Sequence, residues 1–179
     1  MKCKLAFKTI HLVFIILFAQ NAHAESVHNF ILDQNTTPTS IGSNIEFIED
    51  ADHVLNLKEI QFAENWSPSP EIGITKGFTK SAYWLRFSVE NKLITDFDWN
   101  LEFAYPLLDE IVFYNPNDDG GYSKHLLGDH QPFADREIHY RNVVIPITAK
   151  ANQTNTYYVR IIATSSMNAL LKAWPKNTF

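Results

Sequence analysis

The residues best suited to ligand-binding chemistry lie in a short alternating segment, residues 83–90. Trp84 and Arg86 fall on its polar face, whereas the opposite face is apolar. A flat aromatic ring beside a planar cation is what a sugar or a carboxylate ligand stacks on and hydrogen-bonds to. The alternative is structural, with Trp84 packed in the other layer of the fold and Arg86 paired with Asp109 or another nearby acid. Both interpretations stay open.

Three further charged residues, Asp109, Arg136 and Arg141, are candidates for the same ligand site. Asp109 and Arg136 could form a buried ion pair, extended by Arg141, that ties the Tyr105-Pro106 corner to the loop before Arg136. A ligand carboxylate could instead recruit both arginines. Burying one of these charges alone would cost several kcal/mol, which favours structural pairing.

The sequence supports metal binding and catalysis less well than ligand binding. The side chains that could hold a metal lack the spacing of a structural site and the oxygen-rich loop of a calcium site: His125, His130, His139, Asp118, Asp119 and Asp129. Glu102, Asp109 and Glu110 could supply two carboxylates for glycoside hydrolysis, but no motif pairs them. The sequence has no Gly-x-Ser-x-Gly elbow and no phosphate-cradling glycine loop. We therefore expect no cofactor, no metal and no enzymatic activity.

Short strands separated by turns must position these residues. Apolar and polar residues alternate from Ala82 onward, as in strands with one buried face. The expected strands are residues 45–49, 83–90, 99–105, 108–114, 142–148, 156–163 and 169–174. One short helix is expected near residues 57–62, and the spans 67–70 and 120–137 are expected to be rim loops. This pattern predicts an all-β fold with antiparallel pairing, a sandwich or a barrel.

The first 24 residues have the features of a secretory signal peptide. Lysines precede an apolar run over residues 10–19, and an Ala-His-Ala sequence predicts cleavage after Ala24. That run is too short to span a bilayer, which takes roughly 20 residues. Residues 25–40 are polar and are expected to form a flexible leader to one domain over residues 41–179.

Charge and cysteine content narrow the partners and the compartment. The formal net charge of the 179-residue chain is −5, and loss of the three signal-peptide lysines would make it −8. Such a charge gives no basic surface for nucleic acid and disfavours anionic lipid headgroups. The only cysteine, Cys3, lies in the segment to be removed. We therefore expect a soluble, disulfide-free periplasmic domain.

Several short motifs follow one another in order from about residue 45 to the end of the chain. They are Ser81-Ala82-Tyr83-Trp84-Leu85-Arg86-Phe87, Trp99, Leu101-Glu102, Tyr105-Pro106-Leu107-Leu108-Asp109, Gly128-Asp129, Pro132-Phe133, Arg136, Arg141, Tyr158-Val159-Arg160 and Leu171-Lys172-Ala173-Trp174. Each motif alone is weak, but their succession is specific. In this succession the chain resembles the second type of extracellular sensor domain of bacterial seven-transmembrane receptors with diverse intracellular signalling modules.

The resemblance implies a jelly-roll β-sandwich similar to carbohydrate-binding modules, placed in the periplasm ahead of seven membrane helices and a cytoplasmic signalling module. The sequence stops at Phe179, where that membrane region would begin, so we expect a truncated receptor, a stand-alone sensor or a fragment.

On this basis we expect a ligand-sensing domain that binds a carbohydrate or a related small molecule. The candidate ligand-binding residues are Trp84, Arg86, Asp109, Arg136 and Arg141. The alternative is a protein–protein interaction or homodimerisation module without a small ligand. A concave pocket with convergent polar groups would favour the sensor, and a flat apolar patch would favour the interaction module.

Overall fold

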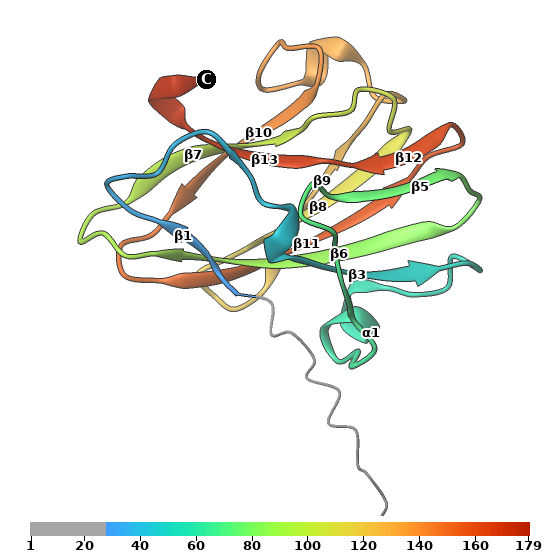
Figure 1. Ribbon diagram of the computed structural model, residues 1–179, viewed down its shortest axis with the longest axis horizontal. Helices are drawn as coiled ribbons and strands as arrows, with labels where there is room; N and C mark the ends of the chain where they lie inside the picture. Colours follow the sequence, from blue (N-terminus) through green and yellow to red (C-terminus); the bar gives the residue numbers. More distant parts are fainter. Residues whose placement is uncertain (1–27) are drawn as a thin grey trace, which may run out of the picture.

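Two packed β-sheets make up most of the fold (Figure 1). The computed structural model describes residues 28–179. The larger sheet has seven strands, in which β1 (Phe30–Leu32) pairs in parallel with β6 and the others follow one another in antiparallel order. That order is β4 (Ser67–Pro68), β3 (Ile45–Asp50), β6 (Ala82–Asn91), β11 (Thr154–Ile162), β8 (Glu110–Pro116) and β9 (Tyr122–Leu127).

The smaller sheet and the remaining elements complete the chain. The smaller sheet has four antiparallel strands in the order β10 (Val143–Ala149), β7 (Phe97–Phe103), β13 (Leu171–Pro175) and β2 (Thr39–Ser40). A separate antiparallel pair consists of β12 (Ser166–Ala169) and β5 (Ile74–Phe78). Three short 3-10 helices are η1 (Gly42–Asn44), η2 (Phe133–Asp135) and η3 (Lys176–Thr178).

The main core lies between the two sheets. Alternate residues of β6 and β7 supply much of it: Tyr83, Leu85, Phe87, Val89, Trp99, Leu101 and Phe103. Phe87, Tyr157 and Phe113 form a stack at its centre, with ring centroids 5.4 and 5.8 Å apart. Aromatic residues bury large apolar areas, so this layer stabilises the packing of the two sheets.

A second, smaller apolar cluster lies on the outer face of the larger sheet. It is covered by α1 (Leu57–Gln61), which lies beside β3 and β6 (Figure 1). Asn56 and Glu59 form a capping box at the start of this helix, which satisfies backbone N–H groups that lack partners within the helix. Ile60 is fully buried and packs with Ile48, Trp84 and Tyr158. The helix therefore closes only part of this face.

The structure confirms a mostly β, sandwich-like fold with antiparallel sheets and one short α-helix among the described residues. The predicted helix and the long predicted strands are present with small shifts at their ends, and the last predicted strand is divided into β12 and β13 at Leu170. The jelly-roll connectivity stays a prediction. Within residues 28–179, no helix is long and apolar enough to cross a membrane.

The structure differs from the sequence-based expectations at the edges of the sheets. The span expected as a rim loop after residue 120 contains β9, whose side chains are mostly half exposed because β9 is an edge strand. The described part of the expected leader carries β1 and β2, and Phe30 and Leu32 of β1 are buried. The predicted signal peptide, residues 1–24, lies outside the described residues.

Candidate ligand-binding sites

Trp84 is on the predicted face of β6, opposite the main core, but it is not at the surface. The residue is 1% exposed, because α1 covers it. Its ring stacks on Tyr114 with centroids 5.7 Å apart. The idea that Trp84 offers an open aromatic face to a ligand is therefore wrong. The residue is structural, but it packs beneath α1 on the outer face of its sheet and not in the other layer of the sandwich.

Arg86 lies on the same face of β6 and is partly exposed. Its Nε donates to Oε2 of Glu46 on β3 at 2.6 Å, and its guanidinium lies 4.4 Å from the centre of the Trp66 ring. The pairing acid is thus Glu46 and not Asp109. The aromatic residue beside the cation is Trp66, which is 20 residues before Arg86 in the chain and was missed in the sequence analysis.

Asp109 is a buried carboxylate with a structural set of partners. Thr164 donates to its Oδ2 from both the backbone N–H and the side-chain hydroxyl, each at 2.6 Å. His130 Nε2 lies 3.9 Å from Oδ1. Burial alone would raise the pKa of Asp109, but the Thr164 hydrogen bonds and His130 lower it below its ordinary value.

We expect Asp109→Asn to reduce the free energy of unfolding by roughly 1–2 kcal/mol at pH 7, because it weakens hydrogen bonds to a charged acceptor. The pKa of the carboxyl is lower in the folded chain than in the unfolded one. Its contribution is therefore complete above the unfolded value of about 3.9 and is lost as the pH falls through the folded pKa. Urea unfolding should therefore show a smaller difference in the free energy of unfolding between the parent protein and Asp109→Asn at pH 3 than at pH 7.

The matched control is Asp129→Asn, since Asp129 is an exposed neighbour. It should leave stability within about 0.5 kcal/mol at both pH values. An Asp109→Asn penalty that is as large at pH 3 as at pH 7 would contradict this account of the carboxylate.

Arg136 and Arg141 lie in the loop between β9 and β10 and do not join Asp109. Arg136 Nη1 donates to the backbone oxygens of Tyr140 at 2.8 Å and Arg141 at 2.9 Å, and its guanidinium lies 5.2 Å from the centre of the Phe133 ring. Arg141 is exposed. The predicted ion pair between Asp109 and Arg136 is therefore absent, and the structure does not gather the predicted residues into one site.

A large polar hollow, which we call the rim bowl, opens at one end of the sandwich. Its volume is about 820 Å³. It lies where β8, β10 and the start of β11 meet, and is lined by Asn115, Pro116, Asn117, Asp118, Gly120, Thr148, Lys150, Gln153, Asn155 and Tyr157. Four of these residues are amides, and no amide side chain among them has a hydrogen-bond partner within residues 28–179. The bowl therefore offers free donors and acceptors.

Tyr157 is the most unusual residue of the rim bowl. The residue is 1% exposed, and its ring is held between Phe87 and Phe113 in the main core. Burial raises the pKa of Tyr157. Its hydroxyl makes no hydrogen bond within residues 28–179, and this oxygen is not itself fully buried, because it opens into the bowl. Because Tyr157 lines the bowl, a bound molecule could supply a hydrogen-bond partner.

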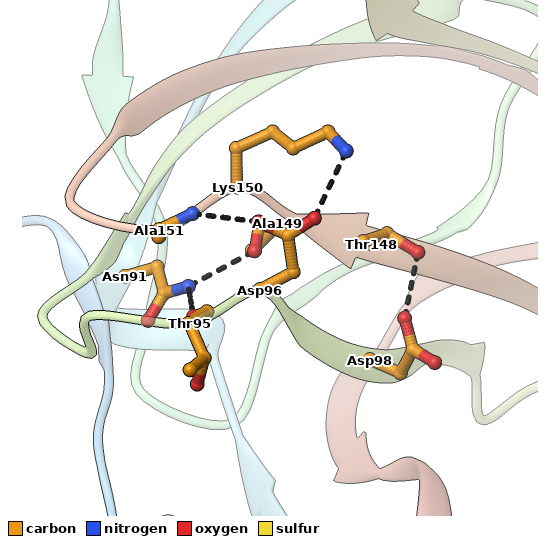
Figure 2. A network of polar contacts seen from close by, with 8 residues as sticks. All are labelled: Asn91, Thr95, Asp96, Asp98, Thr148, Ala149, Lys150 and Ala151. Atoms are coloured by element: carbon orange, nitrogen blue, oxygen red, sulfur yellow. Dashed lines mark hydrogen bonds and ion pairs between the residues drawn. The ribbon is translucent and has the colours of Figure 1, made fainter.

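A polar network fixes the wall of the rim bowl formed by Thr148 and Lys150 (Figure 2). Asp96 accepts from Lys150 Nζ at 2.9 Å and from the backbone N–H of Ala151 at 3.0 Å. Asp98 accepts from the Thr148 hydroxyl at 2.7 Å. The Lys150 ammonium and the Ala151 N–H lower the pKa of Asp96, and Asp96 raises the pKa of Lys150. These contacts hold the wall in one arrangement.

Buried Asn91 anchors this network from below (Figure 2). Its side-chain amide donates to the backbone oxygens of Thr95 at 3.0 Å and Ala149 at 2.9 Å, and its oxygen accepts from Leu93 N–H at 2.9 Å. The amide is therefore satisfied on both sides, and it joins the end of β6 to the end of β10.

The metal hypothesis has no geometric support among the described residues. No group of three histidine, cysteine, aspartate or glutamate side chains within residues 28–179 could hold a metal ion. Asp119 instead accepts from Gly121 N–H at 2.9 Å within the turn between β8 and β9.

Comparison with known proteins places this sandwich among extracellular sensor domains of seven-transmembrane receptors. Residues 42–175 match the family described as 7TMR-DISM extracellular 2, so the chain belongs to that family. The match runs from η1 to the end of β13. Membership implies an extracellular or periplasmic location and association with a seven-transmembrane receptor region, and it points to a non-catalytic module. No curated protein matches the chain.

Proposed function

We propose that this domain senses a neutral carbohydrate, or a related polyhydroxylated small molecule, in the rim bowl. The observation that carries the proposal is the Tyr157 hydroxyl, which opens into a bowl with four amide side chains and, like them, has no hydrogen-bond partner within residues 28–179. A periplasmic domain with its signal peptide cleaved after Ala24, and a jelly-roll connectivity similar to that of carbohydrate-binding modules, are parts of the same proposal.

The chemistry of the lining suits a ligand rich in hydroxyl groups. An amide side chain both donates and accepts hydrogen bonds, as a sugar hydroxyl does. Only Asp118 and Lys150 are charged. Lys150 is paired with Asp96, and Asp118 is exposed, so that solvent screens its charge and the lining selects for no strong ligand charge. A volume of about 820 Å³ lies in the range of small-molecule sites.

The position of the rim bowl suggests how binding would be sensed. A ligand there would bridge the turn between β8 and β9, which carries Asn117, and the turn that links β10 of one sheet to β11 of the other, which carries Gln153. If the ligand binds one spacing of the two turns better than another, it shifts the population toward that spacing. In a full receptor this bias would pass to the membrane region.

The proposal is tested by a thermal-shift screen of the protein against neutral mono- and oligosaccharides and cell-wall glycan fragments. A sugar at 100 times its dissociation constant adds about 2.7 kcal/mol. For a chain of this size, that stabilisation raises Tm by roughly 5–10 °C. For any sugar that binds, Asn155→Ala and Tyr157→Phe should each lower the affinity at least about tenfold, since each removes one polar contact.

Asn65→Ala is the control, because Asn65 is exposed and does not line the rim bowl. It should leave the affinity unchanged. A screen without any shift would overturn the carbohydrate proposal and favour the interaction module, and equal binding by Tyr157→Phe, Asn155→Ala and the parent protein would overturn the assignment to the rim bowl.

A further inference from the structure

A second polar pocket, which we call the Arg86 pocket, opens on the outer face of the larger sheet. Its volume is about 260 Å³. It lies beside β6, where β1 pairs with residues 89–91 and β3 pairs with residues 82–87. Its lining includes Asn44, Glu46, Arg86 and Thr156 but none of the residues that line the rim bowl. The two hollows are therefore separate sites.

Arg86 is held in a fixed position in this pocket. Glu46 binds its Nε at 2.6 Å, and the Trp66 ring lies 4.4 Å from the guanidinium carbon. The two terminal nitrogens have no hydrogen-bond partner in the part of the chain that the structure describes, and the side chain is 30% exposed. A guanidinium edge that is already oriented can bind a carboxylate through two parallel hydrogen bonds.

The same pocket offers acceptors for a cation. Glu46 uses Oε2 for Arg86, and its Oε1 has no hydrogen-bond partner among residues 28–179. Asn44 donates its amide N–H to the backbone oxygen of His28 at 2.8 Å, and its side-chain oxygen has no hydrogen-bond partner among those residues. These two oxygens can accept hydrogen bonds from two of the three N–H donors of an ammonium group.

The charge balance selects between ligand classes. Arg86 and Glu46 neutralise each other, so a simple anion would leave the occupied pocket with a net negative charge. An uncompensated charge in a partly buried site is costly. A ligand with one carboxylate and one ammonium keeps the pocket neutral, and the volume of about 260 Å³ limits it to a small molecule.

We propose that the Arg86 pocket binds a small zwitterion of the free α-amino acid class. The ligand carboxylate lies on the terminal nitrogens of Arg86, and its ammonium lies on Glu46 and Asn44. This assignment goes beyond the proposed carbohydrate function, because it uses a different pocket, other residues and another ligand class.

The test measures binding of the common L-amino acids to the purified protein, each by thermal shift and then by isothermal titration calorimetry. We expect at least one to bind. For that amino acid, the N-acetyl form, which lacks the ammonium, and the carboxamide form, which lacks the carboxylate, should each bind at least tenfold more weakly. Because these ligands are tested on the unaltered protein, they probe the pocket even if a variant fails to fold.

Variants then assign the site. Arg86→Lys keeps the charge but loses the guanidinium edge that binds the carboxylate. Glu46→Gln removes the negative charge that binds the ammonium. Each variant should therefore lower the affinity for the amino acid at least tenfold. Arg160→Lys is the matched control, since Arg160 is on the same face of the sheet and pairs with Glu110 at 3.2 Å. It should leave the affinity unchanged, as should Asn155→Ala in the rim bowl.

Failure of all amino acids to bind would overturn the proposal, and so would equal binding of the N-acetyl form. Binding that survives in folded Arg86→Lys and Glu46→Gln would also overturn it. None of these results bears on the sugar screen, whose critical variants lie in the rim bowl.

Discussion

Replacing Trp84 with alanine is expected to lower the free energy of unfolding by about 3–5 kcal/mol, the range found for large aromatic residues removed from a core. Trp84 is 1% exposed and packs beneath α1 against Ile48 and Ile60. Its removal would leave a cavity between the helix and the sheet. Equilibrium unfolding in urea, followed by far-UV circular dichroism, measures the loss.

Two further variants separate the causes of this effect. Trp84→Phe keeps an aromatic ring and removes an indole N–H that is buried without a hydrogen-bond partner in the described chain, so it should cost less, roughly 1–2 kcal/mol. Phe62→Ala changes a residue that follows α1 and is 79% exposed. It should change stability by less than about 0.5 kcal/mol. A Trp84→Ala loss as small as that of Phe62→Ala would contradict the packing of α1.

The sequence left open whether Trp84 binds a ligand or packs inside the fold, and this ambiguity has a physical cause. Alternation along residues 83–90 correctly placed Trp84 and Arg86 on the face opposite the main core. What covers that face is decided by α1 and Trp66, which lie earlier in the chain and fold back over the sheet. A local pattern reports which face a residue is on, but not what lies above that face.

The reliance on local patterns also explains which strands were predicted and which were not. β6, β10 and β11 are long, and each has one face that is fully or almost fully buried, so their alternation is clear. β1 and β2 have three and two residues, too few for a period to be recognised. β9 is an edge strand with half-exposed side chains on both faces, and its composition therefore resembles that of a loop.

The rim bowl was predicted only in its parts. Turns were expected after the predicted strands 108–114 and 142–148, and two walls of the bowl lie at these turns. Their meeting at one end of the sandwich depends on the pairing of β8 with β11, which no local pattern reveals. Tyr157 matched a buried strand residue. Only the packed structure shows that its side chain also lines the bowl.

Gly128→Ala is expected to lower the free energy of unfolding by roughly 2–6 kcal/mol, because it combines backbone strain with a steric clash. Gly128 has a φ of +120°, and a Cβ there would meet the backbone oxygen of Asp109 at 2.4 Å. The next residues are tied to the same place, since Asp129 N–H donates to the Leu108 oxygen at 2.8 Å and His130 N–H to the Asp109 oxygen at 3.1 Å. The chain therefore has no room to move away.

Gly120→Ala separates strain from clash in this experiment. Gly120 has a φ of +82°, but a Cβ there would meet nothing within 4 Å. Its cost should be that of the backbone conformation alone, about 1–2 kcal/mol. Urea unfolding of both variants should show a clearly larger loss for Gly128→Ala. Equal losses would contradict the clash between the added Cβ and the Asp109 backbone oxygen. The expected larger loss for Gly128→Ala would show that the Gly128-Asp129 motif holds this loop against the start of β8.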